Sequence, residues 1–154
     1  MQGLVPELAR AQGQDAAAVR TLRAAQARIA AATGSTFPTV PARGEANASA
    51  GRLLNRVGTG LPLRVIPGAY AHELTHQENG DPRRSMGPLQ TPRAERAADY
   101  GAGRKLVAAG YLGTGAVAAY LRFVAQSRVG EQHGPGAWRV RATLAGVRDA
   151  LAGR

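Results

Sequence analysis

The segment AHELTHQENGD, Ala71 to Asp81, restricts the possible folds of this chain more than any other stretch, because it holds two of the three histidines. Residues four apart lie on one face of an α-helix, so His72 and His76 would direct their rings at a common point. The Asn-Gly-Asp-Pro sequence that follows is a turn cluster, at which a helix ends. The spacing predicts a pair of metal ligands on one helix or, as the simpler alternative, two histidines on an exposed helix face.

The residue after the first histidine favours the metal site. On a helix, Glu73 is rotated by about 100° from His72, so it can take a proton from a zinc-activated water without ligating the metal. This arrangement is the HExxH motif of metallopeptidases. The chain has no cysteine, so any metal must be held by His, Asp or Glu.

A third protein ligand is offered by the segment TPRAERAADYGAG. It places Glu95 and Asp99 four residues apart on one face of a helix, among alanines that would let two helices pack closely. Glu95 could then reach the metal while Asp99 accepts a hydrogen bond from a ligating imidazole. The alternative is an exposed helix face on which these carboxylates pair with Arg96 or Arg104. We favour that alternative for the segment alone, and the metal site once the HExxH motif is considered.

Helices are expected where apolar residues recur at helical spacing between glycine and proline stops. They cover about Gln14–Thr33, Gly68–Gln77, Pro92–Ala109 with Thr91 as its N-cap, a stretch from near Thr114, and Ala137–Leu151. Two short apolar runs, Leu53–Val57 and Leu63–Ile66, are expected to be strands. We divide the chain into an N-terminal helical segment, residues 1–36, and a second domain, residues 37–154, which together form one compact unit.

The sequence HELTHQENGD followed by AERAADYGAGRKLVAAGYLGTGAVAAYLRF resembles the active-site core of the gluzincin metallopeptidases of the HtpX and CAAX-prenyl-protease type. The resemblance extends over residues 47–145. Upstream, residues 47–61 are similar to that family's Asn-Ala-x-Ala loop, edge strand and Gly-Leu turn. Downstream, QHGPGAWRVRATL resembles its His-Pro signature followed by an arginine.

The resemblance implies an α+β, mostly helical zincin with a small sheet and a Zn²⁺ cofactor. It implies that His72, His76 and Glu95 ligate the zinc, that Glu73 is the general base and that Asp99 supports a ligating histidine. It also places a substrate peptide on an edge strand formed by Leu53, Leu54, Asn55, Arg56 and Val57. His133 would lie near the metal as a catalytic residue, although a histidine in a glycine-rich loop is equally consistent with simple exposure. The function implied is a metalloendopeptidase acting on peptide or protein substrates.

Two other classes of function stay open. One is a zinc-stabilised module that does not cleave and serves as part of a larger assembly. The other, which we favour less, is an arginine-rich nucleic-acid binder, because the net charge is +10 but the arginines are scattered singly. No signal peptide or membrane-spanning run is evident, so a cytoplasmic protein is expected. The sequence leaves the oligomeric state open.

Four aromatic residues are candidates for either the site or the core. Tyr100, Tyr111 and Tyr120 could donate a hydrogen bond to an oxyanion, but tyrosines within helical apolar patterns are more often core residues with an exposed hydroxyl. Trp138 is expected to anchor the last helix in the core.

Overall fold

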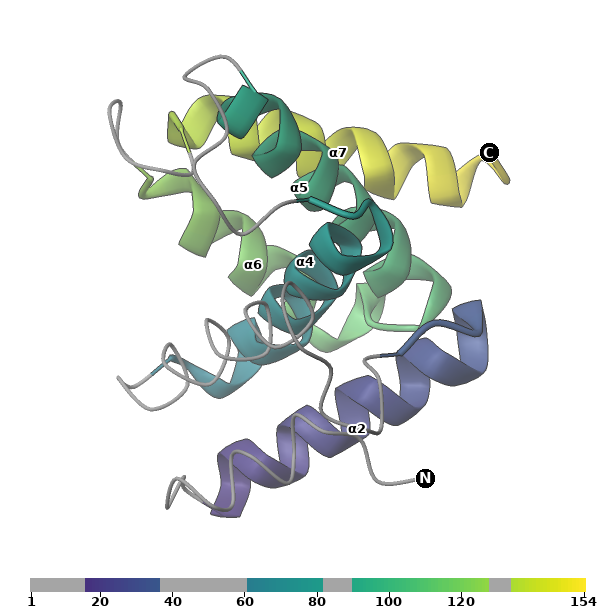
Figure 1. The fold of residues 1–154 in the computed structure, drawn as a ribbon. Coiled ribbons are helices and arrows are strands. Elements are labelled where there is room, and N and C mark those ends of the chain that lie inside the picture. The colour runs from purple at the N-terminus through teal and green to yellow at the C-terminus, as the bar shows by residue number, and fades with distance from the viewer. Residues whose placement is uncertain (1–15, 37–60, 82–89, 128–133) are drawn as a thin grey trace.

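The computed structural model describes residues 16–36, 61–81, 90–127 and 134–154, and Figure 1 shows how their helices are arranged. Five α-helices and two short 3₁₀ helices make up these residues. In chain order they are α2 (Ala16–Thr33), η1 (Leu63–Val65), α4 (Ile66–Glu78), α5 (Gln90–Ala108), η2 (Leu112–Thr114), α6 (Ala116–Ala125) and α7 (Gly136–Leu151).

The expected α+β fold is wrong for this part of the chain, because the described residues are helical and contain no strand. The run expected as a strand, Leu63–Ile66, forms η1 and the first residue of α4 instead. Pro67 explains the difference, because proline is well accommodated in the first turn of a helix, where its missing N–H is not needed. Val65 and Ile66 are buried, so the apolar run packs as a helix entry and not as a strand. The other expected strand, Leu53–Val57, lies outside the described residues.

The helix predictions are confirmed in position, with small shifts at their ends. The prediction that Thr91 is the N-cap of α5 is wrong, because the helix already begins at Gln90 and Thr91 lies inside it. Pro92 still falls within the first turn, where a helix tolerates it.

Helix α5 is the centre of the arrangement, because α4 and α7 both pack along it and α2 covers α4 from the other side (Figure 1). The contact between α5 and α7 depends on glycine: a Cβ on Gly103 would overlap the backbone carbonyl of Thr143, and one on Gly146 would overlap that of Tyr100. The apolar core includes Leu22 and Ile29 of α2, Tyr70 and Leu74 of α4, and Leu106 of α5. The helix with the HExxH motif and the helix with Glu95 and Asp99 are therefore held side by side by packing on both outer faces.

Trp138 is not a core anchor, since 43% of it is exposed. Helix α7 buries Arg139, Thr143 and Val147, so the tryptophan lies one position off the inward face. The guanidinium carbon of Arg96 lies 5.2 Å from the centroid of the Trp138 ring.

Candidate metal centre

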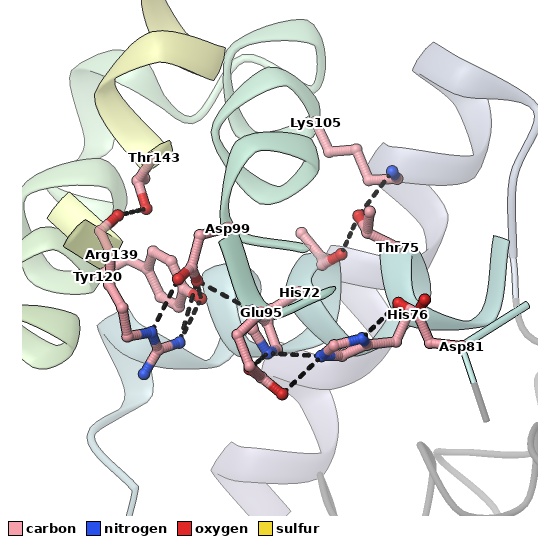
Figure 2. Close-up of polar contacts among 11 residues, drawn as sticks. His72, Thr75, His76, Asp81, Glu95, Asp99, Lys105, Tyr120, Arg139 and Thr143 are labelled. Atoms are coloured by element: carbon pink, nitrogen blue, oxygen red, sulfur yellow. Dashed lines mark hydrogen bonds and ion pairs between the residues drawn. The ribbon is translucent and has the colours of Figure 1, made fainter. Parts of the chain in front are cut away.

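Two adjacent helices bring three potential metal ligands together in the interior (Figure 2). Helix α4 supplies His72 and His76, and α5 supplies Glu95, all three being buried. The two Nε2 atoms are 3.1 Å apart. Glu95 Oε2 lies 3.1 Å from His72 Nε2, and Glu95 Oε1 lies 3.2 Å from His76 Nε2. The three residues that the sequence predicted as ligands are thus within reach of one common point.

The spacing of these atoms fits a tetrahedral ion. With zinc–nitrogen distances of about 2.0–2.1 Å, two ligand atoms at corners of a tetrahedron lie about 3.3–3.4 Å apart. The two Nε2 atoms are 3.1 Å apart, and each lies 3.1 or 3.2 Å from one of the two Glu95 oxygens, which is close to that value. The donor set, two imidazoles and one carboxylate, is also one that zinc accepts in catalytic sites. The residues therefore fit a bound Zn²⁺ without rearrangement of either helix.

Each histidine is held from behind by an aspartate. His72 Nδ1 lies 2.9 Å from Asp99 Oδ1, and His76 Nδ1 lies 2.8 Å from Asp81 Oδ2. An ionised carboxylate can only accept a hydrogen bond, so Nδ1 carries the proton in both rings. The Nε2 lone pairs then point at the common position with Glu95, and only a proton or a metal cation between them makes that arrangement favourable.

The aspartate behind His72 belongs to a buried network that reaches two further helices (Figure 2). Arg139 of α7 donates to Asp99 through Nε at 2.7 Å and through Nη2 at 3.0 Å, which is a bidentate ion pair. The hydroxyl of Tyr120, from α6, donates to Asp99 Oδ1 at 2.7 Å. Arg139 and Tyr120 are themselves buried. The carboxylate that orients His72 is therefore fixed by side chains from two further helices, α6 and α7.

This network sets the protonation of its members in the metal-free protein. Burial by itself would lower the pKa of His72, but the charges and hydrogen bonds of Asp99 and Glu95 outweigh burial and raise it to about 9. Burial would raise the pKa of Asp99, but His72 and Arg139 lower it to about 2. The pKa of Arg139 is raised, because its ion pair with Asp99 outweighs its own burial. Without a metal, a proton supplies the positive charge that the ligand cluster requires.

The predicted general base, Glu73, is fully buried on α4 next to His72. The other predicted site residues, which are His133 and the strand Leu53, Leu54, Asn55, Arg56 and Val57, lie outside the described residues. All three tyrosines considered as oxyanion donors have other partners: the hydroxyl of Tyr100 donates to Asp149 and that of Tyr120 to Asp99, and the ring of Tyr111 stacks against Arg28.

The sequence reasoning missed several residues of the centre. Asp81 was treated only as part of a turn, although an aspartate five residues after a ligand on a helix ending there can fold back onto it. Tyr120 was assigned to the core with an exposed hydroxyl, but that hydroxyl is buried on Asp99. Arg139 lies in the segment QHGPGAWRVRATL, in which sequence reasoning assigned no particular role to an arginine.

None of the helices in the described part of the chain is long and apolar enough to cross a membrane. The comparisons with known proteins add no family to this description: no protein-family model, curated protein or solved structure matches the chain.

Proposed function

We propose that the protein is a zinc metalloendopeptidase that binds one Zn²⁺ through His72, His76 and Glu95. The observation that carries the proposal is the convergence of two Nε2 atoms and a carboxylate, with an aspartate behind each imidazole. Three protein ligands leave a fourth coordination position for water or substrate, which distinguishes catalytic zinc sites from closed structural ones.

The chemistry divides between the ion and one carboxylate. A Zn²⁺ held at this position supplies a Lewis acid that polarises a peptide carbonyl and acidifies a water molecule. Glu73 accepts a proton on its carboxylate from the attacking water and returns it to the leaving amine nitrogen. Asp99 and Asp81 hold one ring proton of each histidine on Nδ1, so that Nε2 is the atom directed at the ligand position. The HExxH motif, which is typical of metallopeptidases, points to a peptide or protein as the substrate.

A second candidate is a zinc-stabilised module that does not cleave. The observation that favours it is the burial of the ligand set, with His72 fully buried and His76 and Glu95 each 4% exposed. A metal in such a position joins α4 to α5, so its binding energy adds directly to the stability of the fold.

One set of measurements tests both candidates. Purified protein is reconstituted with zinc, freed of excess metal and analysed for metal content, and we expect one zinc per chain. The same sample is incubated with a mixture of unstructured peptides, and mass spectrometry identifies the cleavage products with and without 1,10-phenanthroline. Substoichiometric zinc after reconstitution contradicts both candidates, whereas stoichiometric zinc without cleavage favours the second.

The variant Glu73→Gln separates ligation from proton transfer. Because Glu73 is assigned the transfer of a proton and no ligand bond, the variant should keep its zinc and lose peptide cleavage, a loss expected to reach at least about 100-fold for a general base. A variant that loses its zinc, or that cleaves as well as the parent, contradicts the role assigned to Glu73.

A further inference from the structure

Lys105 is the single lysine among the 20 basic residues of the chain, and it occupies a buried position. It lies on α5 with 9% of its surface exposed and faces α4 (Figure 2). Its ammonium group donates a hydrogen bond to Thr75 Oγ1 at 2.9 Å and forms an ion pair with Glu78 Oε1. We call these three residues, Lys105, Thr75 and Glu78, the lysine clamp. It joins the last turn of α5 to the last turn of α4.

The clamp lies at a place where α4 and α5 pack closely together. One turn before Lys105, a Cβ on Gly101 would overlap the side chain of Thr75. The Thr75 hydroxyl donates to the carbonyl of Ala71 at 2.8 Å, so its oxygen is an acceptor for the ammonium group. A compact ammonium with three donors suits this narrow space, whereas the planar fork of an arginine is larger and needs bidentate partners. This explains why a chain that otherwise uses arginine has lysine here.

The last turn of α4 holds one of the two histidine ligands, His76, and leads directly into Asp81, which accepts a hydrogen bond from its ring. Thr75 precedes His76 in this turn, and its carbonyl accepts the backbone N–H of Asn79 at 2.9 Å. The backbone N–H of Asp81 donates to the carbonyl of His76 at 3.1 Å, and the Asp81 side chain accepts from the same residue's ring. A change in the position of this turn relative to α5 therefore moves a ligand and its aspartate together, away from Glu95.

We propose that Lys105 is a positioning residue for His76: the lysine clamp fixes the last turn of α4 against α5 and so sets the separation between His76 and Glu95. The proposal rests on the proposed metal function, because the geometry that it protects is that of the zinc ligands. It assigns the clamp no contact with metal or substrate.

The test compares Lys105→Met with Arg104→Met. Arg104 is the matched control, because it is the neighbouring cation on α5 and its described hydrogen bond goes to the hydroxyl of Tyr100 on the same helix. Zinc affinity is measured by competition with a chromogenic chelator, and ligand geometry by the visible absorption bands of the Co²⁺-substituted protein. We expect Lys105→Met to weaken zinc binding by about 3- to 10-fold and to shift the cobalt bands, since loss of a direct outer partner costs roughly 10- to 100-fold. Arg104→Met should change neither.

A second readout needs no metal. Imidazole nitrogen NMR of the metal-free protein reports whether the ring proton of His76 stays on Nδ1, where Asp81 accepts it. We expect the parent and Arg104→Met to keep this tautomer, and Lys105→Met to populate both. If Lys105→Met fails to fold, Glu78→Gln replaces it, since it weakens the ion pair and keeps the volume. A folded clamp variant with unchanged tautomer, zinc affinity and cobalt spectrum overturns the proposal. If the parent protein binds no metal, but Lys105→Met still changes the tautomer of His76 relative to the parent, only the proposed function is overturned.

Discussion

The two histidines of the HExxH helix have the same hydrogen-bonding pattern but opposite kinds of support. His72 is held by Asp99, which is 27 residues away in sequence, has a fully buried side chain and is fixed by α6 and α7. His76 is held by Asp81, which is five residues away, has an 18% exposed side chain and comes from the turn that ends the same helix. One ligand therefore depends on tertiary packing and the other on a local turn.

The comparison of the two histidines indicates on which side of the centre a substitution should have the larger effect on stability and metal binding. A buried carboxylate paired with a buried guanidinium is costly to disturb, because removal of one partner leaves an uncompensated charge in the interior. A carboxylate near the surface is replaced by water at small cost. Changes on the His72 side should therefore affect both folding and metal binding, while changes on the His76 side should affect metal binding alone.

The largest effect is expected for Asp99→Ala. The variant should bind zinc about 10- to 100-fold more weakly, because His72 loses the acceptor that fixes its tautomer. It should also lose about 3–5 kcal/mol of stability, because Arg139 is left as an unpaired buried cation. Chelator competition and urea unfolding of the metal-free protein measure the two effects. A double variant, Asp99→Ala with Arg139→Met, should recover stability but not zinc affinity, and recovery of both would show that Asp99 has no role at the ligand.

A pH dependence of binding follows from the His72 side. Because the pKa of His72 is raised to about 9 in the metal-free protein, this ring is protonated at neutral pH, and zinc has to displace its proton. Zinc affinity should therefore rise about 10-fold per pH unit between pH 6 and 8. Calorimetry in buffers of different ionisation enthalpy should count at least one released proton per zinc. An affinity independent of pH would contradict protonation of the metal-free cluster.

The same shifts define when the His72–Asp99 pair stabilises the metal-free fold. A raised histidine pKa gives stability that is complete below the ordinary histidine pKa of 6.5 and is lost as the pH rises through about 9. A lowered aspartate pKa gives stability that is complete above 3.8 and is lost as the pH falls through about 2. The melting temperature of the metal-free protein should therefore decline from pH 6.5 to 9, and His72→Gln should abolish that part of the decline.

A smaller effect is expected for Asp81→Ala, on the His76 side. Zinc affinity should fall by about 10-fold, at the low end for an outer partner, because water can take the place of this carboxylate. Stability of the metal-free protein should change by less than about 1 kcal/mol, as for exposed ion pairs. If this variant loses as much stability as Asp99→Ala, the two sides of the centre are equivalent and the comparison fails.

The smallest effect is expected for Tyr120→Phe. It removes one hydrogen bond to Asp99 and leaves the bidentate pair with Arg139 in place, so it should cost about 1 kcal/mol of stability and at most about threefold in zinc affinity. Thermal unfolding and chelator competition check both values. A larger loss of zinc than in Asp99→Ala would mean that the hydroxyl acts on the metal directly.

Sequence reasoning found the parts of this centre that depend on short spacing. His72 and His76 lie on one helix face by periodicity alone, and the same holds for Glu95 and Asp99. The partners of Asp99 were not found, since Tyr120 and Arg139 come from other helices and their hydrogen bonds depend on how α6 and α7 pack.

The prediction of an α+β fold class was wrong for a related reason. A run of four apolar and basic residues, such as Leu63–Ile66, has too few positions to distinguish a strand from the start of a helix. This run forms the start of a helix because Pro67 fits the first helical turn and because Val65 and Ile66 are buried. Trp138 was misplaced because α7 turns a buried arginine, and not its aromatic residue, towards the interior.

The ion pair between Arg139 and Asp99 also has a consequence for the order of events on the ribosome. The chain emerges with His72, His76 and Glu95 first, and α7 with Arg139 is the last described helix to be made. A nascent chain that lacks α7 already holds every ligand, but its Asp99 has no guanidinium to fix it. With the zinc site that we propose, capture of the metal at full affinity would come only after α7 docks against α5.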